Sequence, residues 1–358
     1  MAKTNSLLQD LFDHNDWANE KLFALCQTLS DEQLDHPRDM GFGSLRNTIF
    51  HNLEAEKLWL ERWLGQPWRP LEADASGRSV DEITEEARSI RFNRNELLTQ
   101  EAESDFARIV DFQDSMREAY SFPIGPLMLH VANHGIHHRA QALSFLKHFG
   151  VQVSGGLDYL FWKIAYSSCE FPEESAAPLT EYGLEVMTGE GTVPAFEPER
   201  LKSYFAYNDW AMDRVWQAVT ELPEEKADTE FDMGMGSVRK SLQHMIDAER
   251  WWLANWETEK SPFPRGEKPR TLTEMQQLLA DIRSQRSAFV AQLDENSAKR
   301  VVHVTAGGPV SCFRVTESLL QLCGHGTHHR AQCLNMLRQM GAKPPALDLI
   351  VMLRDQAR

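Results

Sequence analysis

The sequence of 358 residues lacks the features that mark membrane, secreted and nucleic-acid-binding proteins. No apolar run approaches the roughly 20 residues needed to span a bilayer, and the amino terminus, MAKTNSLLQD, has no signal-peptide core. Fifty-three acidic residues against 37 basic ones give a formal charge of −16, and no basic run of the kind that tracks phosphates occurs. We therefore expect a cytoplasmic protein that binds neither membranes nor nucleic acids.

Cysteine is scarce and shows no pairing pattern. The five cysteines, at positions 26, 169, 312, 323 and 333, are odd in number, contain no Cys-x-x-Cys pair and do not match between the two halves of the chain. This pattern is typical of reduced thiols and argues against a disulfide framework.

An internal repeat is the most informative feature that is present. The segment HGIHHRAQ at residues 134–141 recurs almost unchanged as HGTHHRAQ at 325–332. The match extends further, because residues 14–63 align without a gap on residues 207–256. A repeat of this length is far too long for a solenoid and indicates a duplicated domain.

The repeat and the composition together predict two domains joined by a linker. Residues 1–165 form the first predicted domain and residues 196–358 the second. The linker, 166–195, contains prolines, glycines and acids without a sustained helical period. Each half closes with a similar segment, LDYL at 157–160 and LDLI at 347–350.

The fold class predicted for each domain is all-α, with four helices. Apolar periodicity predicts first helices at 5–28 and 198–220, and charged outer third helices at 80–103 and 271–293. Second helices should begin at the N-caps Ser44 and Ser237, and fourth helices should run from near Pro126 to Gly150 and from near Thr316 to Gly341. A small hairpin is expected from Val301 to Phe313, with a less clear counterpart around 109–122.

Three histidines recur at matched positions in the two halves. The paired histidines lie one helical turn apart, so both can face one ion, and a third histidine lies on the predicted second helix. Three imidazole ligands with an open fourth position are typical of a catalytic metal site. The predicted ligands are His51, His134 and His138 in the first half, and His244, His325 and His329 in the second. The alternative is that these histidines cap helices or lie in the core.

Other residues near the histidines remain candidates. The zinc-protease signature does not apply, because Gly135 and Gly326 stand where it requires glutamate. Glu54 and Asp247 lie three residues after the third histidines, where each could orient a ligand, accept a proton or be an ordinary surface acid. The remaining candidates are Gln141 and Gln332 as residues of the cavity, His137 and His328 as rival ligands, and Cys333 as a soft ligand or a buried thiol.

These motifs resemble the DinB/YfiT-like superfamily. The resemblance rests on Asn15-Asp16-Trp17-Ala18, on Gly43-Ser44 followed seven residues later by His51, and on the segment from Asn133 to Gln141, and it covers nearly all of both halves. It implies two tandem four-helix bundles of the up-down-down-up type, each with a divalent metal held by the three histidines. The second copy departs from the pattern in having Gly324 in place of Asn133.

The resemblance also implies an activity. Relatives include transferases and isomerases that use low-molecular-weight thiols, because a zinc-like ion lowers the pKa of a bound thiol. We therefore expect zinc or nickel, or else iron or manganese, in each domain, with a thiol cosubstrate and a small-molecule substrate. The alternatives are a metal-dependent hydrolase with Glu54 and Asp247 as bases, and a non-catalytic protein that binds metal or a small ligand. Many relatives pair as homodimers, so the two domains would form an intrachain pseudo-dimer within a monomeric chain.

Overall fold

The structure is a computed structural model, and it divides the chain into two compact units. It describes residues 4–75, 77–151, 153, 156–166, 193–258, 261–264, 268–305 and 311–357. We call the unit formed by residues 8–153 and 346–358 the first bundle, and the unit formed by residues 1–7 and 154–345 the second bundle. The predicted linker lies almost wholly outside the described residues.

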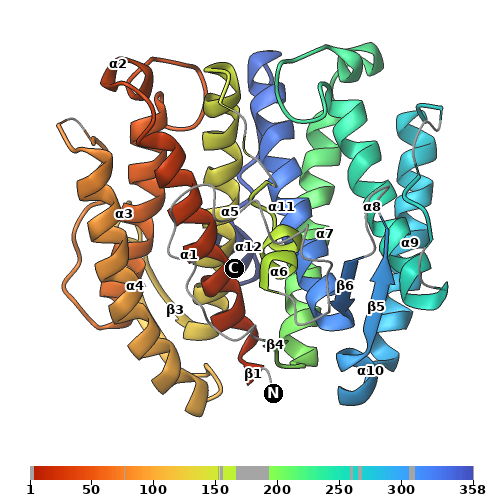
Figure 1. The fold of residues 1–358 in the computed structure, drawn as a ribbon, viewed down its shortest axis with the longest axis horizontal. Coiled ribbons are helices and arrows are strands. Elements are labelled where there is room, and N and C mark those ends of the chain that lie inside the picture. The colour runs from red at the N-terminus through yellow and green to blue at the C-terminus, as the bar shows by residue number, and fades with distance from the viewer. Residues whose placement is uncertain are drawn as a thin grey trace. The chain divides into compact units, whose positions relative to one another are not determined.

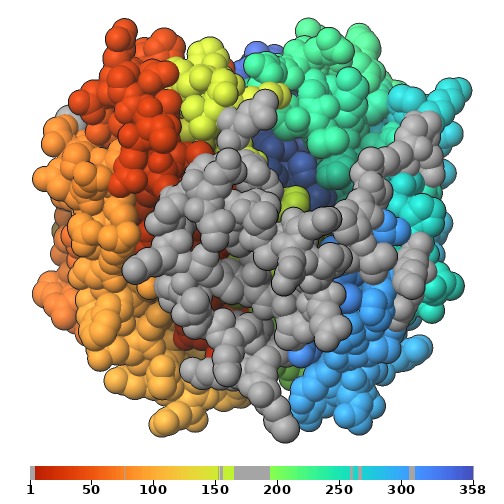
Figure 2. Space-filling view, in the orientation of Figure 1, coloured from red at the N-terminus to blue at the C-terminus, as the bar shows by residue number. Residues whose placement is uncertain are grey.

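The first bundle is built from four long helices that run alongside one another (Figure 1). They are α1 (Leu7–Cys26), α3 (Leu45–Trp63), α4 (Val80–Glu103) and α5 (Ile124–His148). Short elements complete the unit: α2 (Asp31–Leu34), strands β2 (Ile109–Gln113) and β3 (Ala119–Pro123), and α12 (Leu349–Ala357). Helix α4 exposes about every second side chain, and its atoms form an orange face in Figure 2, as expected of an outer helix.

The second bundle repeats this plan. Its long helices are α7 (Pro198–Thr220), α8 (Val238–Thr258), α9 (Leu272–Gln292) and α11 (Val315–Gln339). Its short elements are β1 (Thr4–Asn5), α6 (Tyr159–Tyr166), β4 (Val193–Pro194), the 3-10 helix η3 (Glu224–Asp228), α10 (Glu295–Lys299), β5 (Val301–Val304) and β6 (Ser311–Arg314). The predicted all-α class with two tandem helical bundles is confirmed.

Local capping explains why the helices begin and end where the sequence predicts. The hydroxyl of Ser44 accepts a hydrogen bond from the backbone N–H of Asn47, and the hydroxyl of Ser237 accepts one from Lys240. Gly150 and Gly341 follow the fourth helices with φ of 73° and 82°, which a residue with a Cβ adopts only at a cost.

The expected hairpins are present in both bundles. In the first bundle, β2 and β3 pair antiparallel, with Ile109 opposite Pro123. In the second bundle, β5 and β6 pair antiparallel, with Val301 opposite Arg314, and residues 306–310 between them lie outside the described residues. Each hairpin leads directly into the helix that carries the paired histidines, so it sets where that helix begins.

The short closing segments do not lie in the domains to which their place in the sequence assigns them. Residues 156–166, which include α6, are part of the second bundle, where α6 packs against α11 and β6. Residues 346–357, which include α12, are part of the first bundle, where α12 packs against α5. The compact units therefore differ from the sequence repeat in these two segments, and the domain boundaries at 165 and 196 stay predictions.

A buried arginine joins three helices in each bundle. Arg94 of α4 is 1% exposed and pairs with Asp16 of α1, at 2.6 Å, and with Glu56 of α3. In the second bundle, Arg286 of α9 lies 2.5 Å from Asp209 of α7 and 2.5 Å from Glu249 of α8. Burial raises the pKa of Asp16 to about 6, so the arginine is needed to keep this carboxylate charged. The pairs hold the outer helix in register with the helices beneath it.

Among the described residues, no helix combines the length and the apolar character required to cross a bilayer. The four described cysteines carry free thiols: Cys26, Cys312, Cys323 and Cys333.

Candidate metal centre

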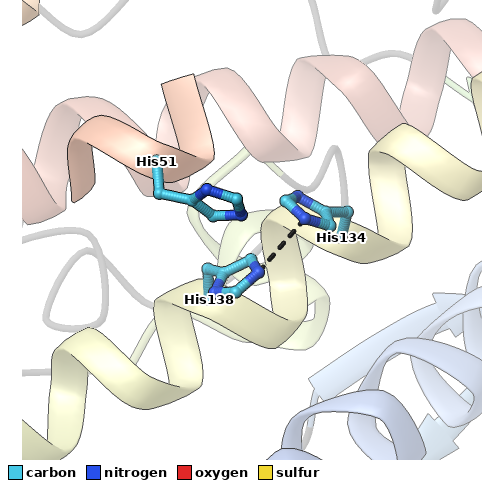
Figure 3. A group of neighbouring side chains, drawn as sticks. All are labelled: His51, His134 and His138. Carbon is cyan, nitrogen blue, oxygen red and sulfur yellow. Dashed lines mark hydrogen bonds between the residues drawn. The ribbon is translucent and has the colours of Figure 1, made fainter. Parts of the chain in front are cut away.

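In the first bundle, two helices bring three imidazole rings together. His134 and His138 lie one turn apart on α5, and α3 contributes His51 from the facing side. Figure 3 shows the three rings turned toward one another, with the His134 and His138 rings joined by a contact between their Nε2 atoms of 3.1 Å. The ring centroids are 4.3 Å apart for His134 and His138, and 4.7 Å for His51 and His138.

The second bundle contains a matching group. His244 lies on α8, and His325 and His329 lie one turn apart on α11. The Nε2 atoms of His244 and His325 are 3.0 Å apart, and the ring centroids of His325 and His329 are 4.4 Å apart. Within each group, one ligand atom from each histidine lies within 4.8 Å of the others, so each group can hold a metal ion.

The spacing and the protonation of these rings fit a metal ion. Two nitrogens bound tetrahedrally to zinc at about 2.0–2.1 Å would lie about 3.3 Å apart, close to the contacts observed. Burial lowers the pKa of His51 to about 2 and lowers the pKa of His134 well below its usual value, so both rings are neutral at pH 7 and can donate a lone pair. The buried Nδ1 of His51 has no hydrogen-bond partner within the described residues.

A glutamine orients the last ligand in each group. Oε1 of Gln141 accepts a hydrogen bond from Nδ1 of His138 at 2.8 Å, and Oε1 of Gln332 accepts one from Nδ1 of His329 at 2.8 Å. An amide oxygen can only accept, so the proton lies on Nδ1 and the Nε2 lone pair is available for the ion. The Gln141 and Gln332 side chains are buried, as a role in the cavity requires.

The same glutamines donate hydrogen bonds to His137 and His328, the alternative ligands considered from the sequence. Nε2 of Gln141 donates to Nε2 of His137 at 3.2 Å, and Nε2 of Gln332 donates to Nε2 of His328 at 2.8 Å. His137 and His328 therefore use the nitrogen nearest the glutamine as an acceptor, and they are absent from the two groups that can hold an ion. This arrangement favours the pairing of histidines four residues apart.

Glycines before the second helices allow a loop to approach each glutamine. Gly41 and Gly234 have φ of 54° and 49°, in the left-handed region that glycine adopts without strain. A Cβ at Gly41 would lie 3.3 Å from Oε1 of Gln141, and one at Gly234 would lie 2.5 Å from Oε1 of Gln332. The loop and the glutamine thus pack directly on each other beside the histidines.

The glycine and the arginine inside the repeated motif have a packing function that the sequence did not reveal. Arg139 donates to Oδ1 of Asn15 on α1 at 2.5 Å, and Arg330 donates to Oδ1 of Asn208 on α7 at 2.5 Å. A Cβ at Gly135 would lie 3.0 Å from the Arg139 guanidinium, so a larger residue there would crowd this pair. Asparagine and arginine recur at aligned positions in the two halves, but no spacing rule in the sequence identifies them as partners.

The two predicted acids are buried and paired with arginines. Oε1 of Glu54 accepts from the guanidinium of Arg69 and from the backbone N–H of Glu72 at 3.1 Å. Oδ1 of Asp247 accepts from Arg270 at 2.9 Å. They are therefore not the ordinary surface acids that one interpretation allowed, and each is held by an arginine from the loop that follows its helix.

Cys333 is a buried thiol of the core. Its side chain is fully buried, and burial raises the pKa of the thiol to about 12. A thiol with so high a pKa is neutral at pH 7 and is a poor ligand or nucleophile. The structure thus favours the packing interpretation over the chemical one.

The hydrophobic surroundings of the two histidine groups differ. The Phe42 ring, between Gly41 and Gly43, stacks on His51 with 3.5 Å between centroids, yet it is 38% exposed. Met235 has the corresponding place in the second half and is 41% exposed. An additional aromatic ring, Phe263, lies 5.8 Å from His244. An aromatic ring thus lies beside one ligand in each group, Phe42 at His51 and Phe263 at His244.

A cleft of about 410 Å³ lies elsewhere in the first bundle, between the end of α3 and the β2–β3 hairpin. Its lining includes Arg62, Trp68 and Tyr120 but none of the six histidines. Arg69 lines it as well and so connects it to Glu54. We do not assign the metal chemistry to this cleft.

Comparison with known proteins now identifies the family. The model of the DinB family matches residues 1–167 and again residues 197–357. The chain belongs to the DinB family. Protein DinB of Bacillus subtilis (strain 168) is 25% identical over 146 residues, which are 38% of this chain and 84% of that protein. One DinB protein thus corresponds to one of the two repeats, and the resemblance and the duplication recognised from the sequence are confirmed.

Proposed function

We propose that this DinB-family protein holds a divalent metal ion in each bundle and catalyses a transfer or an isomerisation with a low-molecular-weight thiol. The observation that carries the proposal is the convergence of three neutral imidazoles, found twice in one chain. Zinc and nickel suit such ligands best, and iron and manganese are the alternatives.

In this proposal the metal ion supplies the chemistry, and side chains of the protein hold and orient it. A divalent ion held by three neutral ligands would lower the pKa of a bound thiol or water and so supply a nucleophile near neutral pH. His51, His134 and His138 would hold the ion in the first bundle, and His244, His325 and His329 in the second. Gln141 and Gln332 would fix the orientation of the last ligand.

The ion pairs that Glu54 and Asp247 form with arginines favour a thiol over water as the nucleophile. The arginines that pair with Glu54 and Asp247 compete for the oxygens that a general base would use. A thiol loses its proton far more readily than water does, so it has less need of a base. In our proposal Glu54 and Asp247 orient the helix and the loop beside the ligands, and in the hydrolase alternative they are the bases.

The substrate proposed is a small molecule with an apolar part. Phe42 presents exposed apolar surface at the first group, which can bind such a part, and Met235 is the exposed apolar residue at the corresponding sequence position in the second half. The net charge of −16 argues against a polyanionic partner. We further propose that the two repeats act as an intrachain pseudo-dimer within a monomeric chain.

The experiment that tests this proposal combines metal analysis with assays of turnover. Purified protein should contain two equivalents of metal per chain, while His138→Ala and His329→Ala should each retain one. A panel of electrophiles should be consumed only when a thiol is added and only in the metal-loaded protein. Hydrolysis without thiol would support the hydrolase instead.

The non-catalytic alternative is separated by removing the metal. A chelator should abolish turnover while the circular dichroism of the helices persists, because buried apolar side chains form the core of each bundle. Collapse of the helices on chelation would indicate a structural ion.

A further inference from the structure

The two closing segments of the chain are exchanged between the bundles. Residues 156–166 follow α5 of the first bundle in sequence but pack in the second bundle, and residues 346–357 follow α11 of the second bundle but pack in the first. Both segments begin with the same pair, Leu157-Asp158 and Leu347-Asp348. The repeat therefore brings one aspartate of each half to the bundle built by the other half.

Specific contacts hold these segments in place. In the second bundle, Leu157 is buried, the backbone N–H of Leu160 donates to Oε1 of Gln321 at 2.8 Å, and Lys163 lies 3.8 Å from Glu317. The partners Gln321 and Glu317 lie on α11, the helix that carries His325 and His329.

In the first bundle, Leu347 is buried and Arg354 lies 3.2 Å from Asp114. The Arg354 guanidinium also lies over the ring of Tyr120, 4.5 Å from its centroid. Asp114 directly follows β2 and Tyr120 belongs to β3, so α12 is anchored to the hairpin that precedes the histidine helix.

Asp158 reaches the hydrogen-bonded chain that orients a metal ligand. Its Oδ1 lies 3.9 Å from Nδ1 of His328, whose Nε2 accepts from Gln332 at 2.8 Å. Gln332 in turn accepts from Nδ1 of the ligand His329 at 2.8 Å. Because Nε2 of His328 is an acceptor, its proton lies on Nδ1, the nitrogen that faces the Asp158 carboxylate.

Asp348 has the corresponding place in the other closing segment, which packs in the first bundle.

We infer that Asp158 is a positioning residue that the first half of the chain supplies to the metal centre of the second bundle. Its carboxylate steadies the chain of hydrogen bonds that runs from His328 through Gln332 to the ligand His329. This inference rests on the proposed metal-binding function.

The test uses the full chain with one centre disabled. In a His138→Ala background only the second centre remains, and Asp158→Asn should lower its affinity for cobalt(II) by about 10- to 100-fold, the range typical of residues that support ligands. In a His329→Ala background, where only the first centre remains, Asp158→Asn should change nothing. Asp348→Asn, in the closing segment that packs in the first bundle, should leave the second centre unchanged.

Controls separate positioning from general damage. Asp355→Asn removes an exposed acid from α12 and should alter neither centre. Asp158→Glu restores the carboxylate and should recover part of the cobalt affinity and the visible absorption spectrum of the bound cobalt. Thermal unfolding of each variant by circular dichroism should stay within a few degrees of its own background.

The outcomes distinguish this inference from the proposed function. Wild-type protein that binds no cobalt or zinc would reject both. Normal binding by the wild type, with Asp158→Asn acting on the first centre or on neither, would reject the exchange and leave the metal function standing. The exchange is supported if Asp158→Asn lowers the cobalt affinity of the second centre alone, and if adding Asp355→Asn to that variant causes no further loss.

Discussion

Replacing Gln141 or Gln332 with leucine should weaken metal binding and leave the bundle folded. Each glutamine accepts a hydrogen bond from Nδ1 of a ligand and donates one to the preceding histidine. The acceptor keeps the ligand in the tautomer whose Nε2 lone pair faces the other two histidines. Leucine has similar bulk but accepts nothing, so the ligand loses this constraint.

The structure suggests the size of the effect. Loss of such a supporting residue typically lowers metal affinity about 10- to 100-fold, or about 1.4 to 2.8 kcal/mol. We expect the larger loss at Gln332, because both of its hydrogen bonds are 2.8 Å long, whereas Gln141 lies 3.2 Å from His137. The metal-free protein should lose about 1–3 kcal/mol of unfolding free energy, because a buried N–H is left without an acceptor.

Zinc competition against a chromophoric chelator would measure this effect one centre at a time. Gln332→Leu is placed in the His138→Ala background and Gln141→Leu in the His329→Ala background. Gln332→Glu retains the acceptor and should keep most of the affinity, and Gln339→Leu, exposed at the end of α11, is the matched control. Affinities of the leucine variants within about twofold of their backgrounds would refute the reasoning about tautomers.

Three further predictions concern stability and selectivity. Arg94→Met, and likewise Arg286→Met, should lower the unfolding free energy by about 3–5 kcal/mol in urea titrations, because each leaves a buried glutamate, Glu56 or Glu249, without its arginine. Exchanging Phe42→Met and Met235→Phe should exchange the substrate preferences of the two centres in single-centre backgrounds, and unchanged kcat/KM ratios would argue against substrate contact. In metal-free protein, the pKa of His51 is lowered to about 2, so below about pH 6.5 the unfolded chain binds a proton that the folded chain does not. Stability should therefore fall with decreasing pH by about 1.4 kcal/mol per unit for this residue, and His51→Gln should reduce that slope.

The helices were predictable because their signals are local. The limits expected for the third helix at 80–103 and for the first helix of the second half at 198–220 agree with α4 and α7. Ser44 and Ser237 were recognisable as N-caps because capping depends on residues three positions apart. The paired histidines could be grouped for the same reason, since residues four apart on a helix share a face.

The supporting residues were harder to identify because their partners are distant in the sequence. Arg139 contacts Asn15 across 124 positions, and Arg94 contacts Asp16 across 78. No spacing rule connects such residues until the helices pack. The pairing of Glu54 with Arg69, which bears on its role as a base, depends likewise on the path of a loop.

By itself, the sequence determined the duplication, the helical class, the family and the six histidines. These follow from periodicity and from repetition, which are properties of the chain in one dimension. Only the tertiary structure decided which bundle each closing segment joins, and therefore that Asp158 faces His328 of the second half. Both closing segments carry the same Leu-Asp pair, so the local sequence does not distinguish the bundle in which each segment packs. That outcome depends on how the chain connects the helices and on how they pack.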